Sequence, residues 1–373
     1  MKNIFKKYGL APALAVSSLL LVVPTTAASA KVVSIKAGDT CSKTQYGKSI
    51  VSLKKQFKCT YNSKAKKYNW SAVSAAAGAA QPIDLTKLDK TGWPKRFVVG
   101  GVPAENVTTM QTKWGGLIQL FKDELGMDVD FYPASSYAGV IEASIANKVD
   151  LVAWGAMSFI VSKLNGARIE PVGITKYVDG TTSYNSRLLT KTSQTGINKI
   201  ADVKGKKVCF VSSTSTSGFL FPTEGLLAAG LTSADYTTVL AGSHDNSLLK
   251  LESGDCDASF MQEATAAAIG TGTFAAIDKS TIKEVWKSSE IPNGPFTIRQ
   301  TLPASFKAAV KNIMLTKLNK AYFTQKGYNG CTSVSTCIIV EDKNTNSFIE
   351  VADSFYDPVR KVCEATKSTA CKA

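Results

Sequence analysis

Short apolar runs alternate with segments of helical periodicity from Phe97 onward. Apolar runs bounded by turn residues predict strands at residues 96–100, 128–132, 150–154, 187–190 and 207–211. Apolar positions at helical spacing predict helices at residues 108–125, 137–147 and in the segment that ends at 229. This alternation is typical of an α/β fold with largely parallel sheets, in which ligands bind at the carboxyl ends of the strands.

The predicted elements form two similar α/β sets without an exact repeat, which predicts two lobes facing one cleft. We expect lobe 1 to comprise residues 84–186 and 295–373, and lobe 2 to comprise residues 187–294. The chain would then cross between the lobes near 184–187 and near 291–299, and these two crossings would form a hinge.

The first 83 residues do not share this alternation. Residues 1–30 have the layout of a secretory signal: three early Lys residues, an apolar stretch from Leu10 to Val23, and Ala28-Ser29-Ala30 at the end. Residues 31–70 predict a small Lys-rich β module, a hairpin held by Cys41 and Cys59, and residues 71–83 predict a linker. The mature chain shows no transmembrane segment and no Cys for a lipid anchor at the cleavage point, so we expect secretion across the cytoplasmic membrane, into a periplasm or to the cell-envelope exterior.

The net charge of +15 is concentrated near the N-terminus. Residues 31–80 contain ten Lys against Asp39 alone, and the body that follows carries only +3. No recognition module accompanies this basic stretch, so we expect no nucleic-acid partner. The stretch could instead hold the protein against an acidic cell wall or an anionic lipid surface.

Eight cysteines in an exported chain predict disulfide bonds. Short spacings favour Cys41–Cys59, Cys331–Cys337 and Cys363–Cys371, which leaves Cys209 and Cys256 to bridge neighbouring strands. There is no CxxC pair and only one His, so the sequence argues against a zinc site, and we expect no metal and no cofactor.

Small hydrogen-bonding residues follow the strand 207–211 without interruption, from Ser212 to Gly218, ahead of an apolar segment with Pro222. Hydroxyls and main-chain N–H groups at the start of a helix favour binding of a phosphate-like oxyanion. A Ser-rich loop that only caps the helix is the competing interpretation.

Seven segments in order resemble the substrate-binding proteins of phosphate, phosphite and phosphonate ABC transporters. The likeness covers about residues 95–325 and rests on residues 100–106 (GGVPAEN), 136–143 (SYAGVIEA), 150–158 (DLVAWGAMS), 215–218 (STSG), 242–245 (GSHD), 253–257 (SGDCD) and 288–295 (SSEIPNGP). The resemblance implies a two-lobed type II periplasmic-binding-protein fold, each lobe a mostly parallel sheet flanked by helices. It also implies a small phosphorus oxyanion in the cleft and delivery of this ligand to an ABC transporter permease.

The resemblance also implies ligand-binding positions, which come from both lobes and are Tyr137, Ser158, Phe159, Ser215, Thr216, Ser217, Gly218, His244 and Asn293. Gln262, just past the predicted strand at Asp257, is a further candidate. Tyr137 could instead only pack at a helix start, and His244 could be a structural residue bonded to Asp245. If His244 binds the ligand, it would supply a donor, or a positive charge when protonated. Glu263 could line the pocket or be solvated.

The chain departs from the family pattern at three positions. Phe159 stands where many relatives have Tyr, so one hydroxyl donor is missing there. Asn293 and Gly294 stand where some relatives have an acid that meets an amino group or a protonated ligand oxygen. These departures favour a small oxyanion without an amine.

The sequence leaves two other classes of protein to consider, an enzyme and a surface interaction protein. Ser215, His244 and Asp245 are the residue types of a hydrolytic triad, but the chain lacks a Gly-x-Ser-x-Gly elbow. A triad also requires Ser and Asp on opposite sides of the His imidazole, and the adjacency of His244 and Asp245 in the sequence argues against that arrangement. We therefore expect no enzyme. The other class is a surface or cell-wall interaction protein that acts through the basic N-terminal module.

Overall fold

The computed structural model describes residues 38–42, 49–52, 55–62, 66–72, 82–340 and 344–371. The chain divides into two compact units between Ser74 and Ala75. The predicted signal peptide and residues 73–81 of the predicted linker lie outside the described residues. Among the described residues, no helix has the length and apolar character that a bilayer crossing requires.

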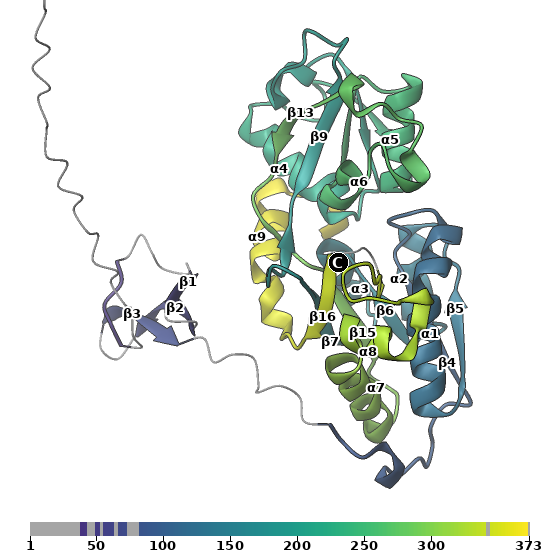
Figure 1. Ribbon diagram of the computed structural model, residues 1–373. Coiled ribbons are helices and arrows are strands. Elements are labelled where there is room, and N and C mark those ends of the chain that lie inside the picture. The colour runs from purple at the N-terminus through teal and green to yellow at the C-terminus, as the bar shows by residue number, and fades with distance from the viewer. Residues whose placement is uncertain are drawn as a thin grey trace, which may run out of the picture. The chain divides into compact units, whose positions relative to one another are not determined.

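The N-terminal unit contains a three-stranded antiparallel sheet (Figure 1), formed in order by β1 (Ser49–Ser52), β2 (Lys55–Asn62) and β3 (Lys67–Ala72). Cys59 lies opposite Trp70 in the β2–β3 register, and both side chains are buried together with Cys41. The sequence predicted only a hairpin, because the four residues of β1 are too few to show a strand period.

The first lobe is built on a six-stranded sheet with the order β16-β7-β15-β6-β4-β5. Its strands are β4 (Arg96–Gly101), β5 (Asp128–Tyr132), β6 (Leu151–Ala153), β7 (Ile169–Tyr177), β15 (Pro295–Arg299) and β16 (Thr345–Ile349). Its helices are α1 (Val107–Leu125), α2 (Tyr137–Ile145), α3 (Ala156–Leu164), α7 (Ala304–Thr316) and α8 (Lys320–Lys326). The α1 helix begins where the Asn106 side chain accepts from the Thr108 N–H and ends at Gly126 in the left-handed conformation, as its sequence predicts.

The second lobe is built on a five-stranded sheet with the order β11-β10-β12-β9-β13. Its strands are β9 (Ser186–Lys191), β10 (Lys207–Phe210), β11 (Thr237–Leu240), β12 (Ala258–Gln262) and β13 (Ile282–Lys287). Its helices are a π-helical turn (Thr216–Leu220), α4 (Phe221–Ala228), α5 (His244–Ser253) and α6 (Glu263–Ala267).

Most strands of each sheet run in the same direction, as the sequence predicted, and each sheet also contains antiparallel strands. The β4 strand pairs in parallel with β5 and β6, and β10 pairs in parallel with β11 and β12. In contrast, β15 is antiparallel to β6 and β7, and β9 is antiparallel to β12 and β13. Each of β9 and β15 follows directly on a segment that crosses between the lobes, so it enters its sheet from the end at which the parallel strands leave.

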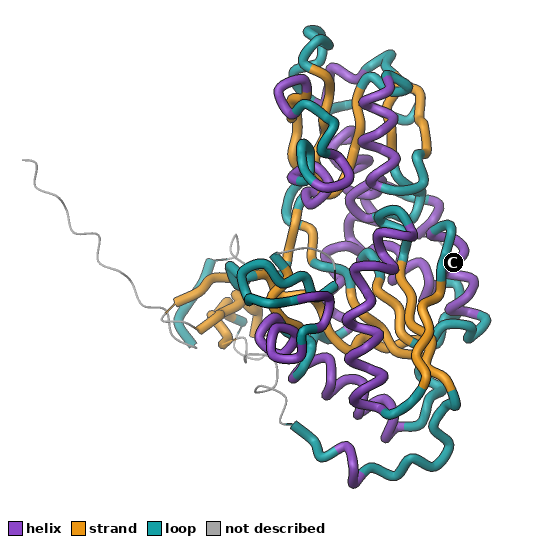
Figure 2. Tube along the Cα trace, turned by 45° about the vertical axis from the view of Figure 1, so that its right-hand side comes forward, coloured by secondary structure: helices purple, strands orange, loops and turns teal. Residues whose placement is uncertain are grey.

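Two short strands mark these crossings: β8 (Ser183–Tyr184) pairs antiparallel with β14 (Ile291–Pro292). The C-terminal helix α9 (Asp357–Thr366) contacts both α3 of the first lobe and α4 of the second, and Figure 1 shows it beside β9. Figure 2 shows the strands (orange) and helices (purple) of both lobes. Tyr356, just before α9, donates to the Asn293 carbonyl at 2.9 Å.

The 3₁₀ turns are Leu85–Lys87, Ile200–Val203, Gly272–Phe274, Lys279–Thr281, Tyr328–Gly330, Asp353–Tyr356 and Thr369–Cys371.

All four predicted disulfide bonds are present, namely Cys41–Cys59, Cys209–Cys256, Cys331–Cys337 and Cys363–Cys371. The Cys209–Cys256 bond joins β10 to the segment just before β12, two strands that pair in the second lobe. It therefore fixes the strand that leads into the Ser/Thr run.

Candidate functional site

The Ser/Thr run forms a tight turn between β10 and α4. The Ser215 hydroxyl accepts a hydrogen bond from the Gly218 N–H at 3.1 Å and so caps the π-helical turn that follows. Pro222 lies in the first turn of α4, where its missing N–H is tolerated. Because Ser215, Thr216 and Ser217 are at most 2% exposed, their hydroxyls are shielded from bulk water.

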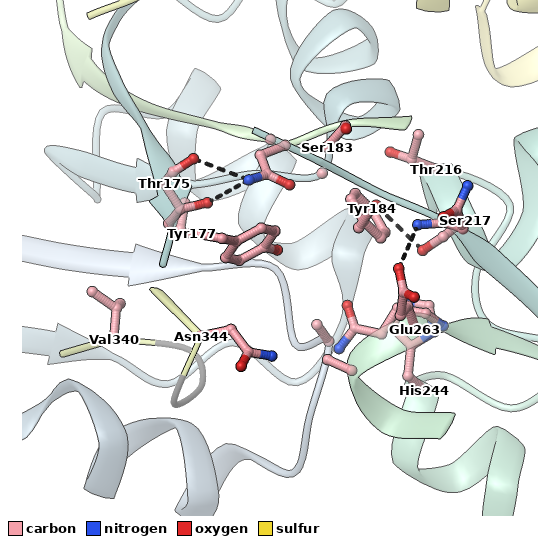
Figure 3. A pocket seen from close by; sticks show the side chains of 18 of the residues that line it. Thr175, Tyr177, Ser183, Tyr184, Thr216, Ser217, His244, Glu263, Val340 and Asn344 are labelled. Carbon is pink, nitrogen blue, oxygen red and sulfur yellow. Dashed lines mark hydrogen bonds between the residues drawn. The ribbon is translucent and has the colours of Figure 1, made fainter. Parts of the chain in front are cut away.

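A cavity of about 540 Å³ lies between the lobes, and its walls include this turn (Figure 3). Of the ten predicted ligand-binding residues, the cavity is lined by Tyr137, Ser215, Thr216, Ser217, His244, Gln262 and Asn293. The structure thus gathers residues from both lobes and from the second crossing around one space.

The other three predicted residues do not line this cavity. The Ser158 hydroxyl is fully buried and bonds the N–H and the carbonyl of Gly155, at 3.1 and 3.0 Å. Phe159 points into the core, where its ring lies 5.2 Å from that of Tyr356. Gly218 packs against Val211, which directly follows β10, since a side chain at 218 would meet Val211 at 2.4 Å. Ser158, Phe159 and Gly218 therefore pack in the interior behind the residues that line the cavity.

Two phenols line the cavity beside the turn. Tyr137, at the start of α2, is buried. Burial raises the pKa of Tyr137, and the Ser215 side chain opposes the rise, so the phenol keeps its proton at neutral pH. Tyr184, on β8, donates to the Ser217 hydroxyl at 3.3 Å.

His244 is a neutral donor in this structure. Its Nδ1 accepts a hydrogen bond from the Gln262 N–H at 3.0 Å, which leaves the single proton of the neutral ring on Nε2. Burial lowers the pKa of His244 to about 3. The expected positive charge is therefore absent at neutral pH, and the alternative of a bond to Asp245 is wrong, because that carboxylate accepts from the Asn106 N–H at 3.1 Å instead.

The charged residues at the cavity are acidic. Within the described part of the chain, no Lys or Arg lines it, while four carboxylates do, namely Glu105, Asp179, Glu263 and Glu290. Glu105 pairs with Lys113 at 2.7 Å, and Glu263 pairs with Arg187. Sequence reasoning left Glu263 open and missed Glu105, Asp179 and Glu290. The cavity therefore contains acidic side chains, although residues 293 and 294 are not acidic.

Asn293 and Gly294 have structural reasons for their identity. The Asn293 amide nitrogen donates to the carbonyl and the hydroxyl of Thr175, at 3.0 and 2.9 Å, which orients the side chain. A side chain at Gly294 would start 1.6 Å from the carbonyl oxygen of Trp154, so the backbone approach leaves no room for an acid.

Comparison with known proteins decides the family. The family model described as "ABC transporter, phosphonate, periplasmic substrate-binding protein" matches residues 99–335. The chain belongs to this family. A phosphate-import protein of Mycolicibacterium smegmatis is 34% identical to this periplasmic substrate-binding protein over 313 residues, which are 80% of this chain and 94% of the relative. The phosphonates-binding periplasmic protein of Escherichia coli is 25% identical over 59% of this chain and 66% of the relative.

Solved structures agree on the type II periplasmic-binding-protein fold. The binding protein of an ABC phosphonate transporter from Pseudomonas aeruginosa has a TM-score of 0.64 at 18% identity, over 74% of this chain and 87% of the other. A Prochlorococcus marinus protein solved in complex with methylphosphonate gives 0.64 at 18% identity, over 74% of this chain and 99% of the other. The members of this family serve transport.

Proposed function

We propose that this substrate-binding protein captures a small phosphorus oxyanion, either phosphate, phosphite or a phosphonate, in the cavity between its lobes and delivers it to an ABC transporter permease. The observation that carries the proposal is the buried hydroxyl cluster Ser215-Thr216-Ser217, which faces Tyr137 of the other lobe across one cavity. Hydroxyl and N–H donors stabilise an oxyanion without a countercharge.

The neutral donors and the four carboxylates that line the cavity favour selection among oxyanions by hydrogen bonding. His244 contributes its Nε2 proton, since Nδ1 is occupied by the Gln262 N–H. An anion held by dipoles is bound and released without breaking a buried ion pair, which suits a carrier that must hand over its cargo. The name of the M. smegmatis relative places inorganic phosphate first among the ligands to test.

A calorimetric titration against phosphate, phosphite, hypophosphite, methylphosphonate, 2-aminoethylphosphonate and sulfate tests this proposal. We expect saturable binding of at least one phosphorus oxyanion and no comparable binding of sulfate. The aminoalkyl ligand shows whether the cavity carboxylates accept an amine. The proposal fails if no phosphorus oxyanion binds or if sulfate binds as tightly as the best of them.

We propose separate roles for the first two segments of the chain. Residues 1–30 would direct export, and the basic segment 31–80 would hold the exported protein at an anionic surface, since it carries ten Lys against one Asp. Deletion of residues 31–80 should abolish retention at the cell surface and leave ligand affinity unchanged. Loss of ligand affinity on this deletion would favour the view that the basic module itself takes part in binding.

A further inference from the structure

The C-terminal segment, residues 353–371, contains the 3₁₀ turn Asp353–Tyr356, the helix α9 and the 3₁₀ turn Thr369–Cys371. It lies beyond residues 99–335, which the family model matches. The structure describes all of its residues, and none of them lines the cavity. However, α9 contacts the π-helical turn that carries two of the buried hydroxyls, and Figure 1 shows α9 (yellow) next to α4. The C-terminal segment therefore reaches the Ser/Thr turn from outside the cavity.

The contact of α9 with the second lobe is apolar. Val359 of α9 is fully buried and lies in one apolar cluster with Leu220, the last residue of the π-helical turn, and Phe221, the first residue of α4. The described side-chain hydrogen bonds of α9 remain within the C-terminal segment, where Arg360 pairs with Asp353 at 2.6 Å. Burial of apolar surface therefore holds α9 against the turn.

The polar and covalent links of the C-terminal segment lead to the first lobe. Lys163 of α3 pairs with Asp353 at 2.6 Å. The Cys363–Cys371 disulfide bond joins α9 to the last 3₁₀ turn, which also contacts α3. The C-terminal segment is thus attached to a helix of the first lobe at both of its ends.

Tyr356 links the same segment to the second crossing. Its hydroxyl donates to the Asn293 carbonyl at 2.9 Å, in an interaction that is buried. Its ring lies 5.2 Å from the ring of Phe159 on α3. Because Asn293 lines the cavity, the start of α9 is fixed both to the first lobe and to a crossing that borders the ligand site.

We propose that the C-terminal segment is a positioning element for ligand capture: the first lobe holds it, and Val359 supports the Ser/Thr turn of the second lobe from outside the cavity. The inference rests on the proposed function of the cavity. A close-packed contact behind the turn restricts the arrangements that the turn can take relative to Tyr137. The apparent affinity of a ligand falls with the fraction of protein in the binding-competent arrangement, so loss of this support weakens binding without removing a ligand contact.

The test compares Val359→Ala with Val310→Ala, by calorimetry against the best phosphorus oxyanion of the panel. Val310 of α7 is also fully buried, but its apolar cluster consists of first-lobe residues. Both variants should lower the urea midpoint to a similar extent, because each removes the same methyl groups from a fully buried position. We expect only Val359→Ala to weaken binding, by about 3- to 10-fold. Equal affinity in the two variants overturns the inference.

Hydrogen exchange in the wild-type protein tests the same coupling, even where Val359→Ala does not fold. Coupling between two sites is reciprocal, so a ligand that fixes the turn should also stabilise its contact with α9. We expect saturating ligand to slow exchange of the α9 amides by a larger factor than exchange of the α7 amides. Equal slowing in the two helices overturns the inference. If the wild type binds none of the oxyanions, the proposed function fails and the inference with it; binding by the wild type with equal affinity in the two valine variants removes the inference alone.

Discussion

At the scale of single residues, Ser215 and Ser217 differ in what their hydroxyls do. Ser215 caps the π-helical turn through the Gly218 N–H, whereas the Ser217 hydroxyl meets Tyr184 and makes no bond to the backbone of the turn. Both side chains line the cavity. Substitution of Ser215 should therefore affect both stability and binding, whereas substitution of Ser217 should affect binding alone.

We expect Ser215→Ala and Ser217→Ala each to weaken oxyanion binding by about 1–3 kcal/mol, because each removes a partner of a buried anion. Only Ser215→Ala should also lower the free energy of unfolding, by about 1 kcal/mol for the lost cap. Calorimetry and urea denaturation measure the two effects. Ser213→Ala, at an exposed position of the same run, is the control, and an affinity loss there equal to that in Ser217→Ala would contradict the assignment.

His244 provides a pH prediction, since its pKa is about 3 in the folded protein and near 6.5 in the unfolded chain. The unfolded state binds this proton first, so the stability that the neutral ring contributes is complete above pH 6.5 and is lost as pH falls toward 3. His244→Asn should flatten the acid limb by up to about 1.4 kcal/mol per pH unit. Because the chain has one His, the imidazole resonance of tag-free protein reports its titration directly. A midpoint near 6.5 in the folded protein would contradict the buried neutral ring.

At the scale of elements, the close approach of the second crossing to β6 depends on Gly294. The backbone at Gly294 runs against the carbonyl of Trp154, and the Trp154 N–H donates to the Pro295 carbonyl at 3.0 Å. This contact fixes how β15 leaves the crossing and joins the first-lobe sheet. Any side chain at 294 would have to separate the two backbones.

We expect Gly294→Ala to lower the free energy of unfolding by at least about 2 kcal/mol, above the usual cost of one added methyl group, because the clash is with backbone. Gly196→Ala is the matched control, since a side chain there would meet nothing within 4 Å. Urea denaturation compares the two variants. Equal stability would show that the crossing can shift to make room.

Residues and elements with local signals could be predicted from the sequence. The α1 helix has a cap at Asn106, an apolar stripe and Gly126 at its end, and the hydroxyl run follows a clear strand. The two-residue strands β8 and β14 show no period, so they could not be predicted, and neither could the antiparallel direction of β9 and β15. Phe159 was misplaced because its ring direction depends on packing against Tyr356, far along the chain, and Glu290 reaches the cavity only through the arrangement of the crossings.

At the scale of the whole molecule, hydrogen bonds join the two lobes beside the cavity. The His244 N–H donates to the Ala104 carbonyl at 2.9 Å, and the Met157 N–H donates to the Thr216 hydroxyl at 2.9 Å. Asp245 accepts from the Asn106 N–H at 3.1 Å, at the start of α1, where the helix dipole favours a carboxylate. These contacts hold the lobes together, so a ligand that touches both lobes stabilises the same arrangement.

Asp245→Asn should therefore weaken ligand binding by about 3- to 10-fold without touching the ligand, because apparent affinity scales with the population of the closed form. The Asp245 carboxylate is 7% exposed, and burial raises its pKa. The hydrogen bond from the Asn106 N–H and the nearby charge of Lys113 oppose this rise and stabilise the charged form. The weaker binding should appear as a faster dissociation rate in stopped-flow measurements. Small-angle scattering should give a larger radius of gyration for Asp245→Asn than for the wild type. Asp255→Asn removes the same charge from an exposed pair with Lys250 in the same lobe. Identical dissociation rates in the two variants would show that Asp245 does not hold the lobes together.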